Sequence, residues 1–124
     1  MPAKVMRLMP RERICLDPSR IESLHAQLGV DEVQAMVDRA MTELCTLRDD
    51  LSIQYRGQRI SDFQRSLRRL GRICDHLGLP LVSQIARDVA ECLQRGDATA
   101  TSATWARLRR NMDAAISGRW MVPA

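Results

Sequence analysis

Aromatic side chains are scarce in this 124-residue sequence, which holds two tryptophans, one tyrosine and one phenylalanine. Apolar residues nevertheless make up 45% of the chain, so the core has to be built mainly from Leu, Ile, Val, Met and Ala. That composition is typical of a helical bundle. A chain of this length is expected to form one domain around a single core, because it is too short for two.

Long apolar runs are also missing. No segment approaches the length of a membrane span, and the opening MPAKVMRLMPRER contains no apolar run long enough for the core of a signal peptide. The four cysteines, Cys15, Cys45, Cys74 and Cys92, form no C-x-x-C pair. Three of them fall on predicted apolar faces, where cysteine packs as a small hydrophobe. We therefore expect a reduced protein in the cytoplasm, with no membrane partner.

The patterns of known catalytic sites are absent as well. The sequence has no metal-spaced Cys/His cluster, no glycine-rich phosphate loop and no Ser/His/Asp context, so it predicts no enzymatic activity, no metal and no cofactor. It does have an excess of cations, with 19 Lys and Arg against 15 Asp and Glu and a pI near 9.3. This charge suits an acidic protein partner or nucleic acid without distinguishing them.

The central feature of the sequence is the segment 61–81, SDFQRSLRRLGRICDHLGLPL, which reads as one amphipathic helix. Ser61 and Gln64 form a capping-box pattern that predicts its start, and Gly78 followed by Pro80 predicts its end. At about 100° per residue, an apolar sector faces a polar one. The apolar sector holds Phe63, Leu67, Leu70, Ile73, Cys74 and Leu77, and the polar sector holds Arg65, Arg68, Arg72, Asp75 and His76.

Other helices are predicted on both sides of this one. Asp17 with Pro18 predicts the start of a short helix that Gly29 closes, and Asp31 with Gln34 predicts the start of a long helix. Two more helices are expected after Pro80 and after the turn RGDATAT, and no strand pattern precedes the central helix. The predicted fold is all-α, an up-down-up-down four-helix bundle with a short N-terminal capping helix. Its predicted parts are a partly ordered basic tail at 1–13, the bundle at 14–118 and a C-terminal tail at 119–124.

This arrangement resembles the histidine-containing phosphotransfer (HPt) domains of two-component phosphorelays. The segment LDPSRIESLHAQLGVDEVQAMVDRAMTELCTLRDDL is similar to the short first helix and long second helix of that family. The segment LRRLGRICDHLGLPLVSQIARDVAECLQRGDATATSATWARLRRNMDAAI is similar to its second half. The resemblance covers nearly the whole chain, and it implies a protein that works with the receiver domains or histidine kinases of phosphorelays.

The active helix of the family carries a phosphorylatable histidine, a lysine three residues on, a glycine four on and a second glycine ten on. With Gly78 aligned to the last glycine, these first three positions hold Arg68, Gly71 and Arg72, and all three depart from the pattern. An arginine guanidinium stays protonated and is a poor nucleophile, so Arg68 cannot carry a transferable phosphoryl group.

The resemblance and its departures together imply a pseudo-phosphotransfer module that binds a response-regulator receiver domain or a histidine kinase without carrying phosphate. The run of arginines is one-signed, with only Asp75 nearby, whereas a merely solvated face usually mixes signs. An acidic partner and a merely solvated face both stay open at this point. The candidate partner-binding residues are Arg65, Arg68, Arg69, Gly71, Arg72, Asp75 and His76.

Three alternatives stay open. His76 is a candidate for a displaced phosphoacceptor in an active phosphotransfer protein. A nucleic-acid-binding bundle would use the arginines of the central helix as phosphate contacts, together with Arg107, Arg109 and Arg110. The apolar residues Trp120, Met121 and Val122 are interpreted as a staple onto the bundle, and the alternative is that they form the contact of a homodimer.

Overall fold

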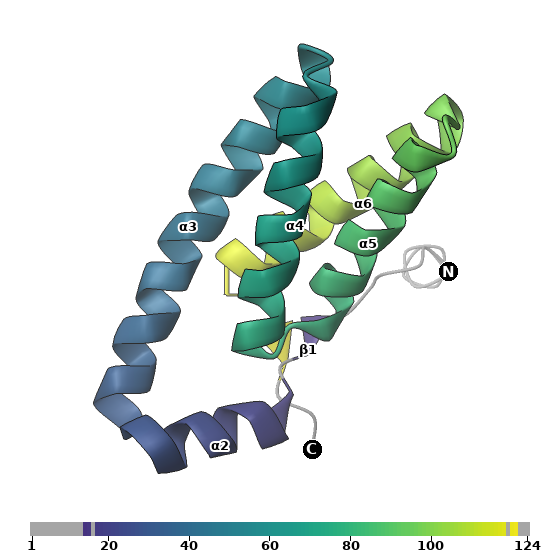
Figure 1. The fold of residues 1–124 in the computed structure, drawn as a ribbon. Helices are drawn as coiled ribbons and strands as arrows, with labels where there is room; N and C mark the ends of the chain where they lie inside the picture. The colour runs from purple at the N-terminus through teal and green to yellow at the C-terminus, as the bar shows by residue number, and fades with distance from the viewer. Residues whose placement is uncertain (1–13, 16, 119, 122–124) are drawn as a thin grey trace, which may run out of the picture.

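The computed structural model describes residues 14, 15, 17–118, 120 and 121 of the chain. Figure 1 shows a bundle of helices, which confirms the all-α prediction at this level. No helix within the described ranges is long and apolar enough to cross a membrane. The predicted tail at 1–13 lies outside the described residues. The helices are α2 (Pro18–Leu28), α3 (Val30–Arg56), α4 (Ile60–Leu77), α5 (Pro80–Gln94) and α6 (Ala98–Ile116).

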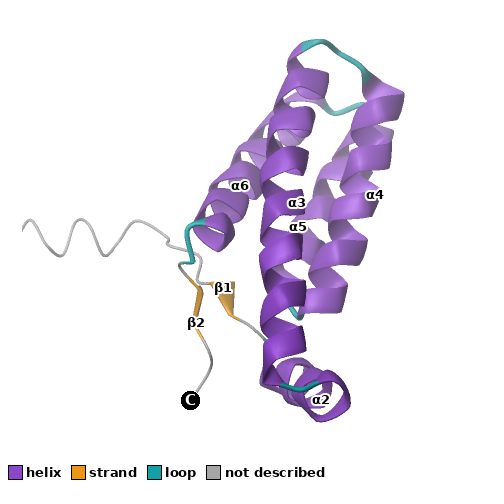
Figure 2. Cartoon of the chain, turned by 90° about the vertical axis from the view of Figure 1, so that its left-hand side faces the viewer, coloured by secondary structure: helices purple, strands orange, loops and turns teal. Residues whose placement is uncertain are grey.

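The four long helices surround one apolar core. Helix α4 packs between α3 and α5, while α6 packs against α5 and α3. Helix α2 crosses one end of the bundle and is seen nearly end-on in Figure 2. The core is aliphatic apart from an aromatic cluster in which Phe63 and Trp105 meet edge to face, with ring centroids 5.5 Å apart and Tyr55 beside them. Fully buried side chains include Leu44, Leu51, Leu70, Leu77, Leu79, Ile85, Leu108 and Met112.

Two of the predicted helix caps are wrong. Helix α4 begins at Ile60, one residue before Ser61, because the N–H of Phe63 already donates to the carbonyl of Arg59 across the preceding turn. Helix α3 begins directly after Gly29, so Asp31 lies inside its first turn rather than at the cap. The Asp17 cap is confirmed, since its carboxylate accepts a hydrogen bond from the N–H of Ser19 at 3.0 Å.

A short strand pair, unexpected from the sequence, joins the two ends of the described chain. Strand β1 (Ile14–Cys15) pairs in parallel with β2 (Trp120–Met121), with Ile14 opposite Trp120. A strand of two residues is too short to show the alternation of apolar and polar side chains that marks a strand. The sequence therefore contained no pattern that predicts this pair. The main chain of β1 also lies close to α5 and α6, so the backbone pairing holds β2 near the bundle. The staple interpretation concerns the apolar side chains at 120–122 and stays a prediction. Val122 lies outside the described residues.

Gly78 has a second role beyond ending α4. Its backbone is left-handed, with φ 76° and ψ 43°, as the predicted helix stop requires. Its carbonyl also accepts a hydrogen bond from the N–H of Asp17 at 2.8 Å, and a Cβ at this position would lie 3.1 Å from the Cβ of Arg20. The absence of a side chain therefore allows α2 to approach the junction between α4 and α5.

Candidate functional site

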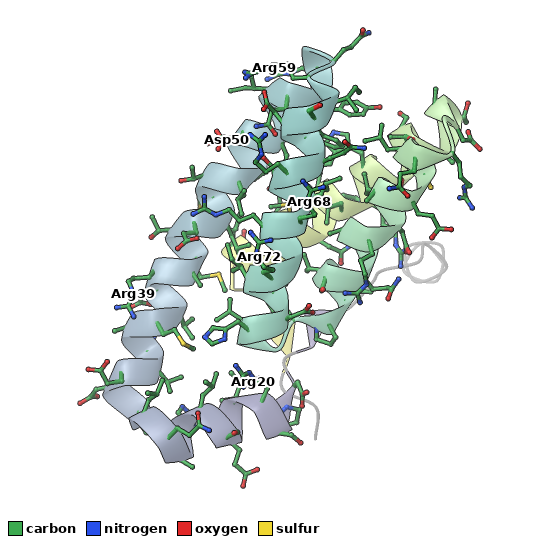
Figure 3. All side chains as sticks on the ribbon, viewed as in Figure 1. Arg20, Arg39, Asp50, Arg59, Arg68 and Arg72 are labelled. Carbon is green, nitrogen blue, oxygen red and sulfur yellow. The ribbon has the colours of Figure 1, made fainter. Side chains whose placement is uncertain are left out.

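The exposed side of α4 is the surface on which the sequence placed the candidate site. Burial of the apolar sector against α3 and α5 turns the opposite side outward. Arg65, Arg68, Arg72 and His76 are exposed and follow one another at spacings of three or four residues, so they lie along one side of the helix. Figure 3 shows Arg68 and Arg72 directed outward from α4. The side chains buried on the other side are Phe63, Leu67, Leu70, Cys74 and Leu77.

The exposed side of α4 does not carry positive charge alone, contrary to the prediction from the sequence. Arg65 forms an ion pair with Asp62 at 3.5 Å, one turn earlier on the same helix. Arg69 forms an ion pair with Glu43 of α3 at 3.3 Å, a partner that sequence spacing along α4 does not reveal. Asp75 turns toward α5, where Arg87 lies 3.9 Å away. Acidic side chains therefore compensate part of the predicted cationic surface.

Arg68 and Arg72 differ from their neighbours in this respect. Within the described residues, neither guanidinium has a hydrogen bond or an ion pair to another side chain. They are four residues apart and so stand one above the other on the helix surface. The structure thus reduces the cationic surface of α4 to a pair of uncompensated guanidinium groups, which we call the Arg68/Arg72 pair.

Gly71 does not belong to this exposed surface. It is half-buried and faces α5, where its carbonyl accepts a hydrogen bond from the hydroxyl of Ser83 at 3.5 Å. A Cβ at Gly71 would lie 4.0 Å from that hydroxyl oxygen, which is ordinary van der Waals contact. Gly71 therefore contributes to the contact between α4 and α5, and it offers no side chain to a partner.

His76 is held by an arginine that sequence reasoning missed. Arg20 of α2 donates from Nε to the carbonyl of His76 at 2.9 Å, and its Nη2 lies 2.9 Å from Nδ1 of the imidazole. A guanidinium only donates hydrogen bonds, so Nδ1 accepts and, in the neutral ring, Nε2 carries the proton. The two residues are 56 positions apart, and only the folding of α2 across the end of α4 brings them together.

A shallow hollow of about 270 Å³ lies between α3 and α4, beside Arg72 and His76. Its floor is apolar and comes from both helices, with Met36 and Ala40 on α3 and Ile73 and Leu77 on α4. Arg39, Glu43, Arg72 and His76 complete its lining. No sequence pattern predicts this hollow, because it depends on how the two helices pack.

A further titratable group of α4 is the buried thiol of Cys74. Burial raises the pKa of the Cys74 thiol to about 12, with a smaller contribution from the charge of Asp75, so this thiol stays protonated and unreactive at neutral pH. Across the part of the chain that the structure describes, no three His, Cys, Asp or Glu side chains come together in a way that would hold a metal ion.

The arginines of the nucleic-acid alternative do not gather on one surface. Arg107 lies 3.8 Å from Asp88 of α5. Arg109 lines a separate polar cleft between α3 and α6. In that cleft Arg48 donates to Asp113 at 3.1 Å, and this hydrogen bond raises the pKa of the Arg48 guanidinium. Because α6 packs against α5 and α3, these groups lie away from the exposed side of α4.

Comparisons of the chain with models of protein families, with curated proteins and with solved structures found no match.

Proposed function

We propose that this chain is an HPt-like signalling module, with the helices in up-down-up-down order, that binds a response-regulator receiver domain or a histidine kinase through the exposed side of α4 without carrying phosphate. The observation that carries the proposal is the Arg68/Arg72 pair. These two guanidinium groups occupy positions of the resembled active-helix motif, face solvent, and have no acidic partner within the described residues.

The chemistry of the pair suits an acidic surface. A guanidinium binds a carboxylate or a phosphoryl group through two parallel hydrogen bonds, and such charge-assisted contacts are about twice as strong as neutral ones. Two uncompensated guanidinium groups one turn apart also favour association with a partner that presents a cluster of carboxylates. The active site of a receiver domain has that character in the resembled family. Since Arg68 is a poor nucleophile, the contact would hold the partner without accepting its phosphoryl group.

His76 is a weak alternative acceptor in this geometry. Attack through Nδ1 is blocked by Arg20, which donates to that nitrogen at 2.9 Å. Attack through Nε2 requires its proton to move to Nδ1, and the Arg20 contact opposes that tautomer. The proposal therefore keeps His76 as a structural neighbour of the binding surface.

The test uses the purified chain and purified receiver domains from the same organism, each with and without phosphorylation. Binding is measured by calorimetry, and acid-labile phosphate on the chain is measured in parallel. We expect binding without phosphate transfer, and we expect Arg68→Glu to weaken it by about tenfold or more, because a charge reversal adds repulsion to a lost contact.

Arg110→Glu is the matched control, because Arg110 is an exposed arginine of α6 with no hydrogen bond or ion pair within the described residues. It changes the net charge of the chain by the same amount as Arg68→Glu. Equal weakening by both variants would indicate only a general charge effect and would contradict a specific site on α4. Phosphate on the chain that disappears in His76→Ala would replace the proposal with an active phosphotransfer protein. If the purified chain retains nucleic acid and binds no receiver domain, the result would favour the nucleic-acid alternative.

A further inference from the structure

The hollow between α3 and α4 combines an apolar floor with a cationic border. Met36, Ala40 and Ile73 are partly buried side chains that pack against the core, and Leu77 is 2% exposed. The bottom of the hollow is therefore formed by apolar side chains at the edge of the core. Burial of such a surface by a ligand is favourable in proportion to the apolar area removed from water.

The charges around this floor are not balanced. Arg39 and Arg72 line the hollow, and neither has a hydrogen bond or ion pair within the described residues. Arg20 of α2 binds the carbonyl and the ring of His76, one of the lining residues, and forms no ion pair with a carboxylate within the described residues. The one acidic lining residue is Glu43, which Arg69 already engages at 3.3 Å. Figure 3 shows Arg20 beyond the end of α4, below Arg72.

His76 adds a further donor to the border. With Nδ1 accepting from Arg20, Nε2 carries a proton and is a hydrogen-bond donor. The lining thus offers guanidinium and imidazole donors beside an apolar floor. A ligand that satisfies both parts needs an anionic group at one end and an apolar body at the other.

The size of the hollow limits the apolar body. A volume of about 270 Å³ corresponds to about nine water volumes of about 30 Å³ each, and so to a ligand of about nine non-hydrogen atoms. This is just below the range of about 300 to 1,000 Å³ that is typical of drug-sized ligand sites. The hollow therefore matches a medium-chain or simple aryl carboxylate, whereas a large cofactor or a nucleotide would extend beyond it into solvent.

We infer that the hollow is a binding site for a small amphipathic carboxylate, whose chain lies on the floor formed by Ala40 and Ile73 and whose carboxylate lies beside Arg72 and His76. Nothing in the proposed interaction with a receiver or a kinase requires this site. A ligand there would neutralise Arg72, so it would also oppose docking of an acidic partner on the Arg68/Arg72 pair.

The experiment is a titration of the full chain with octanoate, followed by calorimetry and by ¹H–¹⁵N chemical-shift changes. Saturable binding is expected, with shift changes centred on residues of α3 and α4 that line the hollow. Octanol represents the apolar chain of the ligand without its carboxylate, and acetate represents the carboxylate without the chain. Each is expected to bind at least about fivefold more weakly than octanoate, because each lacks one of the two interactions.

Three variants test the two parts of the site separately. Arg72→Gln is expected to weaken octanoate about fivefold or more and to leave octanol unchanged. Ala40→Leu places a larger side chain on the floor of the hollow and is expected to abolish binding of both octanoate and octanol. Glu43→Gln removes the acidic side chain and is expected to tighten octanoate, a result that a partly unfolded variant would not produce. Arg68→Gln is the matched control, because Arg68 does not line the hollow.

The inference is overturned if octanoate shows no saturable binding at millimolar concentration, or if Arg68→Gln weakens it as much as Arg72→Gln does. It is also overturned if shift changes centre outside the hollow, for example on the polar cleft that contains Arg109. These outcomes are separate from those of the receiver experiment, because no receiver is present and Arg68 is expected to matter only for the receiver.

Discussion

Arg20 of α2 binds the last turn of α4 through two atoms of His76, donating to the carbonyl oxygen and to ring Nδ1, each at 2.9 Å. The neighbouring Asp17 donates its N–H to the carbonyl of Gly78 at 2.8 Å. The first turn of α2 is thereby fixed on the end of α4. This contact places Arg20 against His76, which lines the hollow, and it gives α2 a position that its own short apolar stripe would not determine.

Arg20→Ala is expected to loosen α2 without unfolding the bundle. It removes two hydrogen bonds while leaving the Asp17 to Gly78 backbone bond, so the free energy of unfolding should fall by about 1 to 2 kcal/mol. Native-state hydrogen exchange should show the largest loss of protection in 18–28. Arg110→Ala, in an exposed position of α6, should change stability by under about 0.5 kcal/mol. Unchanged exchange in α2 would contradict the contact.

Gly78→Ala is expected to destabilise more than Gly96→Ala. Both glycines have a positive φ, 76° and 68°, so an alanine costs about 1 to 2 kcal/mol at either position from backbone strain alone. At Gly78 the new Cβ would also lie 3.1 Å from Arg20, whereas at Gly96 nothing lies within 4 Å. Chemical denaturation of the two variants separates the strain from the contact. Equal losses of stability in the two variants would show that α2 moves away from the new Cβ at little cost in free energy.

Leu70→Ala tests the assignment of the two sides of α4. Leu70 is 0% exposed, so the substitution leaves a cavity and should lower the free energy of unfolding by about 2 to 5 kcal/mol. Arg68→Ala, two residues earlier on the exposed side, should change it by under about 0.5 kcal/mol. A neutral result for Leu70→Ala in urea denaturation would mean that the buried side of the helix is wrongly assigned.

The buried thiol of Cys74 predicts a loss of stability in alkaline solution. Its pKa rises from an ordinary value of 9.0 to about 12, so between these values the unfolded chain gives up a proton that the folded chain keeps. Proton release then favours the unfolded state, and stability falls as the pH rises above 9.0. The loss at pH 10 should be about 1.4 kcal/mol and should be absent in Cys74→Ala. Identical pH profiles for the two proteins would contradict this prediction.

Sequence periodicity predicted the helices well because each long helix has a continuous apolar stripe. The stripe on α4, from Phe63 to Leu77, is the clearest case, and all of its buried residues lie in the predicted sector. The capping patterns at Ser61 and Asp31 were less informative, because a helix starts where the preceding turn supplies backbone acceptors. That turn geometry is set by residues such as Arg59 and Gly29, which make no side-chain capping hydrogen bond.

The candidate site was predictable only along a single helix. Spacing placed Arg65, Arg68 and Arg72 on one exposed side, and the structure keeps them there. Spacing gave no information about Glu43 or Arg20, which reach α4 from other helices and alter its charge and the hydrogen bonding of its histidine. Gly71 was assigned to the surface from the motif position alone, whereas the packing of α5 covers it.

The parallel pairing of β1 with β2 brings the two ends of the described chain together, so the backbone between Ile14 and Met121 follows a nearly closed ring. If the two ends of such a chain are joined and the backbone is cut at another turn, each helix still packs against the same neighbours. The turn at Gly96 is exposed and lies between α5 and α6, away from the hollow and from the exposed side of α4. A circular permutant that starts at Asp97, with a short linker from residue 121 to residue 14, would therefore retain both candidate surfaces.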